Sequence, residues 1–321
     1  MKNFEGRIAV ITGGGTGMGR ELARQLANEG CHVALCDVSV ENMEETLSLC
    51  EKESPDGTRF SLFEADVSRE DQMMAFRNHV AESLGTSHIN LLFNNAGVGG
   101  AGSFIDGDRK EWDLTFGVCW GGVYNGCRAF IPMLVASEEG HLINTSSVNG
   151  FWASLGPQIA HTAYSAAKFA VKGFTEALVN DFKLNAPHVG VSLVMPGHVG
   201  TSIVINSGRI LGMDPKEMND EELEKVRERL LNMGLPVENV PNEMIRMGMI
   251  QRGNDFRDKA PLTAADAATI ILDGVRSRKW RVLVGQDAEI LDRMVRETPE
   301  EAYTEEFMER LLAETPWNLG G

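Results

Sequence analysis

Several features that mark particular classes of protein are scarce in this sequence. Its five cysteines among 321 residues are odd in number and show no Cys-x-x-Cys spacing, so neither a disulfide framework nor a zinc site is indicated. No apolar run is long enough to cross a bilayer, and residues 1–6 do not resemble a secretory signal. Positive charge is also scarce, because 30 Lys and Arg face 46 Asp and Glu, for a net charge of −16. We therefore expect a cytoplasmic protein that binds no metal, no nucleic acid and no membrane.

A glycine-rich turn between a predicted strand and a predicted helix lies near the start of the chain. Residues 8–11 form an apolar, β-branched run that predicts a buried strand, and residues 12–19 read Thr-Gly-Gly-Gly-Thr-Gly-Met-Gly. Strand, glycine turn and helix together can bind a dinucleotide pyrophosphate at the helix N-terminus. Gly13 and Gly17 would let the backbone approach the phosphates, and Gly19 would let helix and strand pack closely. Such a turn alone is also found in ordinary loops.

An acidic residue follows the second predicted strand. Asp37 comes directly after the apolar run 33–36 and lies 18 residues beyond Gly19. A carboxylate at this position can accept hydrogen bonds from the adenosine ribose and would repel a 2′-phosphate, which favours NAD over NADP. The plainer alternative is an Asp that caps a turn at the end of a strand.

The rest of the chain alternates between predicted strands and helices. A long helix is expected over 110–136, and further strands are expected at 60–65, 89–93, 141–144, 189–194 and 281–284. This alternation predicts an α/β fold with a doubly wound parallel sheet of about seven strands. Binding and chemistry are then expected beyond the carboxyl ends of the strands.

The final third of the chain departs from this pattern. Residues 203–261 interrupt the alternation and are rich in methionine, and an amphipathic helix that begins with an Asn-x-x-Glu capping box is predicted over 219–233. We interpret 1–321 as a single domain that carries 203–261 as an inserted helical substrate cap and 298–321 as an acidic C-terminal tail. Methionines adapt to irregular apolar ligands, although simple packing of the insertion onto the body is an equal alternative.

The sharpest chemical motif is Tyr-Ser-Ala-Ala-Lys at 164–168. Residues i and i+4 share a helix face, so the Tyr164 hydroxyl and the Lys168 ammonium can approach one pocket. A nearby cation stabilises a phenolate and lowers the pKa of tyrosine from about 10, which makes Tyr164 a candidate general acid or base. A surface helix pair is the alternative, but the motif follows the hydroxyl-rich residues 145–147 at the end of the fifth predicted strand.

Taken in their order along the chain, these motifs resemble those of the short-chain dehydrogenase/reductase family. The resemblance covers about 5–202 and resumes near 263–296, and it rests on the glycine turn, Asp37, Asp66-Val67, Asn94-Asn95-Ala96-Gly97, Ser147, Tyr164 with Lys168, and Pro196 to Thr201. It implies a Rossmann-type fold, hydride transfer between a nicotinamide cofactor and an alcohol or ketone, and a homotetramer or homodimer. With Asp37, it leads us to expect NAD and a medium-sized, mainly apolar secondary alcohol or ketone.

The resemblance also implies roles for individual residues. Tyr164 would be the acid/base, Ser147 would hold the substrate oxygen, and Lys168 would lower the pKa of Tyr164 and hold the nicotinamide ribose. Among the implied cofactor contacts, Val199 and Thr201 would meet the carboxamide. The full set of these contacts is Gly13, Thr16, Gly17, Met18, Gly19, Asp37, Asp66, Val67, Asn95, Ala96, Gly97, Thr145, Tyr164, Lys168, Pro196, Gly197, Val199 and Thr201.

Two departures from the family pattern bear on the chemistry. Cys119 stands where the family carries an asparagine that holds a proton-relay water. Because a thiol is a weak hydrogen-bond partner, the relay is altered or served by another group, for which Asn125 is the nearby candidate. Ser147 and Tyr164 are 17 residues apart, which is longer than in most members, so the residues near 155–162 should reshape the pocket wall. 

The sequence leaves open the roles of two histidines and the choice between the expected function and two alternatives. His161 and His198 are either substrate contacts or ordinary loop histidines. An NADP-dependent ketoreductase is one rival function, and the absence of an arginine near Asp37 argues against it. A catalytically retired NAD-binding sensor or scaffold is the other, favoured only by Cys119 and opposed by the intact Ser147, Tyr164 and Lys168.

Overall fold

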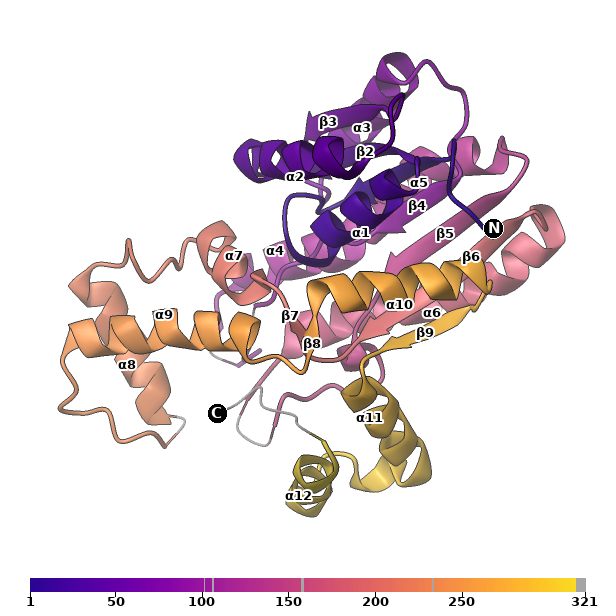
Figure 1. The fold of residues 1–321 in the computed structure, drawn as a ribbon. Coiled ribbons are helices and arrows are strands. Elements are labelled where there is room, and N and C mark those ends of the chain that lie inside the picture. The colour runs from indigo at the N-terminus through magenta and orange to yellow at the C-terminus, as the bar shows by residue number, and fades with distance from the viewer. Residues whose placement is uncertain (101, 106, 157–158, 233, 316–321) are drawn as a thin grey trace.

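A seven-stranded parallel sheet lies at the centre of the computed structural model, which describes residues 1–321 except 101, 106, 157–158, 233 and 316–321 (Figure 1). Its strands are β1 (Ile8–Thr12), β2 (His32–Asp37), β3 (Phe60–Glu64), β4 (Leu91–Asn94), β5 (Gly140–Thr145), β6 (Val189–Pro196) and β9 (Arg281–Val284). Their spatial order is β3-β2-β1-β4-β5-β6-β9. The chain therefore starts in the middle of the sheet, winds to one edge and returns to build the other, which confirms the Rossmann-type, doubly wound fold.

Helices cover both faces of the sheet, which explains why its central strands are continuous apolar runs. Every position of β1, β5 and β6 is buried. The helices α1 (Gly17–Asn28), α2 (Val40–Glu53) and α10 (Ala264–Arg276) pack together on one face. The other face carries α3 (Glu70–Ser83), α4 (Arg109–Phe116), α5 (Gly122–Val135) and α6 (Thr162–Asn185).

The long helix expected over 110–136 is present but changes register in its middle. Between α4 and α5 lies one π-helical turn, Gly117–Gly121, and this turn contains Cys119. A π-turn inserts one extra residue into a helix and is frequent at functional sites. It brings the Cys119 side chain into a fully buried position beside α6.

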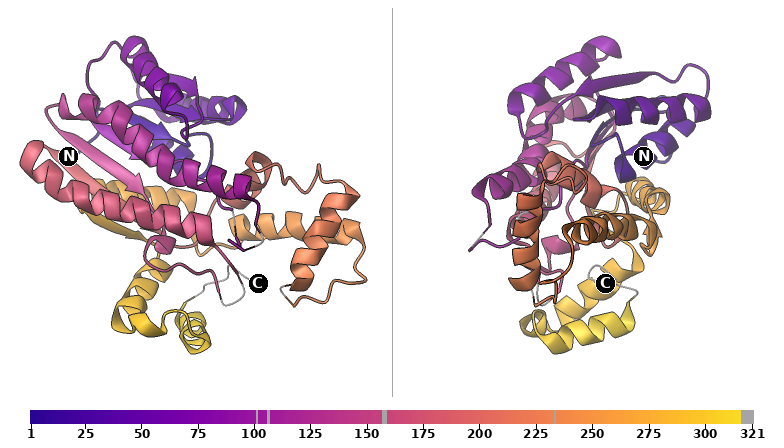
Figure 2. Two further views of the ribbon diagram at one scale, coloured as in Figure 1. Left: turned by 180° about the vertical axis from the view of Figure 1, so that it is seen from behind. Right: turned by 90° about the vertical axis from the view of Figure 1, so that its left-hand side faces the viewer.

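The insertion folds into three helices beyond the carboxyl ends of the strands (Figures 1 and 2). These are α7 (Ile203–Ile210), α8 (Asp220–Asn232) and α9 (Asn242–Asp258). The predicted capping box is confirmed at the start of α8, because the Asn219 and Glu222 backbone N–H groups each donate to the other's side chain, at 2.9 and 3.1 Å. Met233, the expected end of this helix, lies outside the described residues. Two-residue strands, β7 (Val199–Gly200) and β8 (Leu262–Thr263), pair at the base of the insertion.

The C-terminal segment is helical and packs beneath the loop that follows β5. It comprises α11 (Gln286–Glu297), a 3₁₀ turn at Pro299–Glu301 and α12 (Glu305–Glu314), while 316–321 lie outside the described residues. The buried indole of Trp152 donates to the Ala302 carbonyl at 2.6 Å and packs against the ring of Phe307. The expected acidic tail therefore contributes a hydrophobic face to the core.

Candidate active site

A cleft at the carboxyl ends of β1, β2 and β4 gathers most of the predicted cofactor residues. It encloses about 200 Å³. The predicted residues that line it are Gly13, Thr16, Gly17, Met18, Asp37, Asp66, Val67, Asn95, Ala96, Gly97 and Thr201. Segments that are far apart in the sequence thus meet in one groove, as a bound dinucleotide requires.

The glycine turn has the geometry that its sequence predicts. Gly13 and Gly17 have φ angles of +65° and +54°, a region that residues with a side chain rarely adopt. Gly19 does not line the cleft, and a Cβ there would lie 2.0 Å from the carbonyl oxygen of Gly13. Gly19 therefore allows α1 to pack directly against the turn, with its N-terminal N–H groups facing the cleft.

The Asp37 carboxylate is held at the edge of this cleft by two backbone groups. Its Oδ2 accepts from the Gly15 N–H at 3.0 Å and its Oδ1 accepts from the Ser39 N–H at 3.1 Å. The turn-capping alternative is thus present, and the same carboxylate also lines the nucleotide cleft. Across the described part of the chain, no salt bridge involves Asp37, so its charge is uncompensated. These contacts fit the adenosine half of a dinucleotide.

Further polar groups in the cleft are fixed by the loops around them. The Asp66 Oδ1 accepts from the backbone and the hydroxyl of Ser68, at 2.9 and 2.7 Å. The Asn95 amide donates to the Thr12 carbonyl at 3.2 Å, and its buried Oδ1 has no partner among the described residues. An acceptor left open in this way is available to a donor on a bound cofactor.

Ser147, Tyr164 and Lys168 come together beyond the end of β5. Ser147 and Tyr164 line a second, larger cavity of about 1000 Å³ that also reaches Thr16 and Gly17, so it adjoins the nucleotide cleft. The Lys168 ammonium is buried, lies 5.4 Å from the centre of the Tyr164 ring and donates to the Thr145 carbonyl at 2.9 Å. The spacing of the sequence motif therefore does bring these groups to one place.

The pKa of Tyr164 moves in the direction opposite to the sequence prediction. Burial raises the pKa of the phenol, Cys119 adds to the rise, and Ser147 opposes it through a hydrogen bond. Lys168 was expected to lower this pKa, but its ammonium donates to a backbone carbonyl, and burial lowers its own pKa. Removal from water is the largest cause of the pKa shift of each group. The phenol is consequently protonated at neutral pH.

Cys119 and Asn125 occupy different surroundings. The fully buried Cys119 thiol donates to the Val98 carbonyl at 3.1 Å. A Cβ built on Gly97 would lie 3.8 Å from this sulfur and 3.7 Å from the Lys168 ammonium, so the thiol lies close to the catalytic candidates. The Asn125 amide instead donates to the Val67 carbonyl at 2.9 Å, on the adenine side of the cleft. This contact does not favour a relay through Asn125, and that role stays a prediction.

The two histidines have distinct places. His161 precedes α6, lines the larger cavity and lies 4.7 Å from the Tyr164 ring, measured between ring centres. Burial lowers the pKa of His161 to about 4, so it is neutral at pH 7. His198 is almost fully buried. Its backbone N–H donates to Asp287 at 2.6 Å, and its Nε2 donates to the Phe256 carbonyl at 2.8 Å. His198 thus ties the loop after β6 to α9 and α11.

The remaining predicted contacts approach the site mainly through their backbone. Thr145 offers its carbonyl to Lys168, and Pro196 is the last residue of β6. Gly197 lines the larger cavity, and its N–H donates to the Val284 carbonyl at 3.0 Å. The Val199 side chain packs in the core. Only the backbone of Val199 can therefore face a carboxamide.

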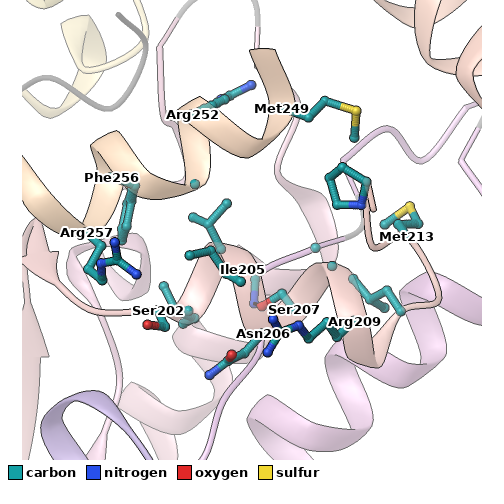
Figure 3. A pocket seen from close by; sticks show the side chains of 18 of the residues that line it. Ser202, Ile205, Asn206, Ser207, Arg209, Met213, Met249, Arg252, Phe256 and Arg257 are labelled. Carbon is teal, nitrogen blue, oxygen red and sulfur yellow. Dashed lines mark hydrogen bonds between the residues drawn. The ribbon is translucent and has the colours of Figure 1, made fainter. Parts of the chain in front are cut away.

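Helix α7 contributes to the nucleotide cleft, which the sequence motifs do not indicate. Ile203, Asn206 and Ile210 line the cleft, and the Asn206 amide donates to the Thr16 hydroxyl at 3.1 Å. These residues lie one helical turn or two apart, so they form one face of α7, on which Figure 3 labels Asn206. No short motif marks them, and the only signal is that α7 begins two residues after Thr201.

Metal-ligand clusters and membrane-spanning helices are both absent from the described residues. No group of three or more His, Cys, Asp or Glu residues among them is arranged to hold a metal ion. None of the described helices combines the length and the apolar character needed to cross a membrane.

Comparisons with known proteins give a consistent result. The sequence model of the short chain dehydrogenase family matches residues 7–209. SadH of Mycobacterium tuberculosis, which is named as an oxidoreductase, is 32% identical over 296 residues, 92% of this chain and 92% of that protein. A short chain dehydrogenase/reductase from Burkholderia phymatum, solved in complex with NAD, has a TM-score of 0.73 and 29% identity and covers 94% of this chain and 96% of its own.

A third relative differs in its cofactor. A metagenomic short-chain oxidoreductase solved in complex with NADP has a TM-score of 0.53 and 31% identity, over 60% of this chain and 83% of its own. The family model, the curated relative and the solved structures agree with the fold and with the ordered motifs. The chain therefore belongs to the short-chain dehydrogenase/reductase family of NAD(P)-dependent oxidoreductases.

Proposed function

We propose that this oxidoreductase transfers hydride between NAD(H) and a medium-sized, mainly apolar secondary alcohol or ketone. The observation that carries the proposal is the meeting of Ser147 and Tyr164 in a cavity that adjoins the nucleotide cleft, with buried Lys168 behind them. The cavity of about 1000 Å³ exceeds what a very small alcohol needs.

The proposed mechanism assigns each group one task. Bound NAD(H) supplies or accepts the hydride. The Ser147 hydroxyl holds the substrate oxygen, while the protonated Tyr164 phenol donates its proton to that oxygen as the carbonyl carbon gains hydride. In the reverse reaction the Tyr164 oxygen takes the proton from the alcohol. The Lys168 ammonium stabilises the phenolate that exists between these events.

The preference for NAD rests on Asp37. Its uncompensated carboxylate lies in the cleft, beside the half-exposed side chain of Val38, where a 2′-phosphate would need a cation. The NAD complex of the Burkholderia relative supports this preference, and the NADP complex of the metagenomic relative makes the direct comparison necessary.

The insertion 203–261 acts, in this proposal, as the substrate cap. Apolar side chains from it line the larger cavity, and those that Figure 3 labels include Ile205, Met213, Met249 and Phe256. The tail 298–321 supports the site from the opposite side, since its described part packs against Trp152, five residues after Ser147. The whole chain then serves as one catalytic domain.

We also propose that the protein is a cytoplasmic homotetramer or homodimer. All five cysteines are free and buried, which suits a reducing compartment. Helix α5 exposes Tyr124 at 42%, with its ring centre 6.1 Å from that of Trp120, and helix α6 exposes Phe169, also at 42%. Aromatic side chains of this kind are enriched at protein interfaces. Light scattering of the purified chain measures the oligomeric state, and a monomer would contradict this part of the proposal.

The test of the proposed function is Tyr164→Phe, which removes the transferable proton and keeps the ring. Turnover of ketones, followed by NADH absorbance, should fall about a thousandfold, while NADH binding is retained. Tyr124→Phe, at an exposed tyrosine outside both cavities, is the matched control and should stay active. Lys168→Ala should impair both turnover and binding. Near-normal turnover of Tyr164→Phe would contradict the mechanism, and an inactive but NAD-binding wild type would favour the sensor.

A further inference from the structure

The wall of the larger cavity that the insertion provides carries positive charge as well as apolar side chains. Lys216, Arg229 and Arg252 line this cavity. Within the described part of the chain, none of the three side chains makes a hydrogen bond or a salt bridge. This is unusual in a protein with a net charge of −16, where acidic partners are abundant.

The acidic side chains of the insertion that line the cavity, Asp214 and Asp255, do not neutralise these cations. Asp214 is paired with Arg209 at 3.2 Å, and Asp255 is paired with Lys259 at 2.9 Å. All four of these side chains also line the cavity, so their charges cancel in pairs. Lys216, Arg229 and Arg252 therefore give this wall an excess of positive charge.

The three cationic side chains lie among apolar side chains. Arg252 lies between Met249 and Phe256 along α9 (Figure 3), and all three residues line the cavity. On α8, Arg229 is next to Leu230, which lines the same cavity. A surface of this composition matches a ligand that is apolar along its length and negatively charged at one end.

The nicotinamide cofactor does not account for these charges. Most of its predicted residues line the smaller cleft, and that cleft includes none of Lys216, Arg229 and Arg252. The three cations belong to the insertion, which extends away from the sheet (Figures 1 and 2). They face the space in which the substrate of the proposed reaction would lie.

We propose that the substrate is an anionic amphiphile. Its carbonyl or hydroxyl group lies at Ser147 and Tyr164, its apolar body lies along the insertion, and its carboxylate or phosphate is held by Lys216, Arg229 and Arg252. This inference rests on the proposed function of the same cavity, and it adds a charged group to the mainly apolar substrate described there. Arginine suits this role because its planar guanidinium binds carboxylate and phosphate with two parallel hydrogen bonds.

The experiment compares ligands that differ in charge. A medium-chain oxo acid, its methyl ester, and a phosphate monoester of the matching hydroxyketone are each offered with NADH. We expect the KM of the better anion to be about tenfold lower than that of the ester, as one or two solvent-exposed ion pairs would give. The advantage should shrink in high salt because such pairs are screened. The two anions distinguish a carboxylate head from a phosphate head.

Variants locate the charge recognition. Arg229→Met with Arg252→Met should raise the KM of the anion about tenfold and leave the KM of the ester and both kcat values within twofold. Lys225→Met is the matched control, because Lys225 lies on α8, pairs with Glu221 and does not line the cavity. Thermal melts confirm that each variant is folded. Equal KM values for anion and ester, or an equal shift of both in the double variant, would overturn the inference.

A binding measurement separates this inference from the proposed function. Calorimetric titration of the NADH-loaded protein with the oxo acid, the phosphate ester and the methyl ester requires no turnover. Tighter binding of an anion, lost in the Arg229→Met/Arg252→Met variant, supports the inference even if every ketone is left unreduced, and then only the proposed function fails. No preference for either anion over the ester in this titration would overturn the inference even if neutral ketones are reduced.

Discussion

Replacing Asp37 by Asn is the sharpest test of how the cofactor is selected. The substitution removes the charge and keeps one oxygen, so one of the two backbone hydrogen bonds, from Gly15 or from Ser39, can remain. The turn should therefore keep its shape. A change in cofactor preference would then report the charge of Asp37 and not a rearranged backbone.

The magnitude follows from the exposure of the site. Two unit charges about 6 Å apart interact by about 0.7 kcal/mol in water and about 3 kcal/mol at an effective dielectric constant of about 20. Because Asp37 is partly exposed, we take about 1–2 kcal/mol of repulsion toward a 2′-phosphate, or about 5- to 30-fold in affinity. Loss of a charged acceptor for the ribose hydroxyls should weaken NADH binding by about five- to tenfold.

The assay is a titration of each variant with NADH and with NADPH, followed by the quenching of tryptophan fluorescence. The wild type should prefer NADH, and Asp37→Asn should remove most of that preference. Asp37→Ala with Val38→Arg should reverse it, since Val38 lies half-exposed in the same cleft and an arginine there can hold the phosphate. Equal or tighter binding of NADPH by the wild type, or an unchanged ratio in Asp37→Asn, would refute the reasoning.

Three further perturbations test other parts of the structure. Burial lowers the pKa of His141 to about 3. Below about pH 6.5 the unfolded chain therefore takes up a proton at this residue that the folded chain does not. The free energy of unfolding should fall by about 2 kcal/mol between pH 6.5 and 5 for this reason. Urea titrations at both pH values should show a shallower fall in His141→Asn, and an identical fall would contradict the cause. Cys119→Ala should lower the free energy of unfolding by about 1 kcal/mol, because the hydrogen bond to the Val98 carbonyl is lost. Turnover should stay within about threefold of the wild type. A folded but inactive variant would assign the thiol a part in the chemistry. Trp152→Phe should lower the melting temperature and kcat together while leaving NADH affinity unchanged, and unchanged kcat in a destabilised variant would show that the tail does not support Ser147.

The sequence predicts the sheet well because its strands are buried on both faces and so read as uninterrupted apolar runs. The ends of these strands are predicted less well than their presence. β4 begins at Leu91 and not at Ile89, since the Ile89 N–H donates to the Met133 carbonyl and not to a neighbouring strand. The two-residue strands β7 and β8 have no pattern of their own. The helical tail is recognisable only once Trp152 is available as its distant packing partner.

The site is predictable wherever a residue acts through its type and its spacing. Asp37 and the Tyr164–Lys168 pair take the predicted positions in one adjoining pair of cavities, although their catalytic and binding roles stay predictions. The direction of the Tyr164 pKa was not predictable from the spacing, because burial of the phenol is the largest cause of the shift and the Lys168 ammonium donates to a backbone carbonyl. The contact of Asn125 with the Val67 carbonyl was not predictable either, since a helix pattern does not tell which carbonyl an amide will reach.

The order of strands has a consequence for how the protein is made. β6 is buried at all eight positions, but one of its two neighbours, β9, begins roughly 85 residues after β6 ends, and the whole insertion lies between them. At a translation rate of about 5–20 residues per second, the edge of β6 stays unpaired on the ribosome for roughly 4–17 s. During that interval its apolar edge is a template for wrong strand pairing. Chaperones should therefore bind the nascent chain mainly at β6. Shortening the insertion should reduce this binding, because β9 would then follow β6 sooner.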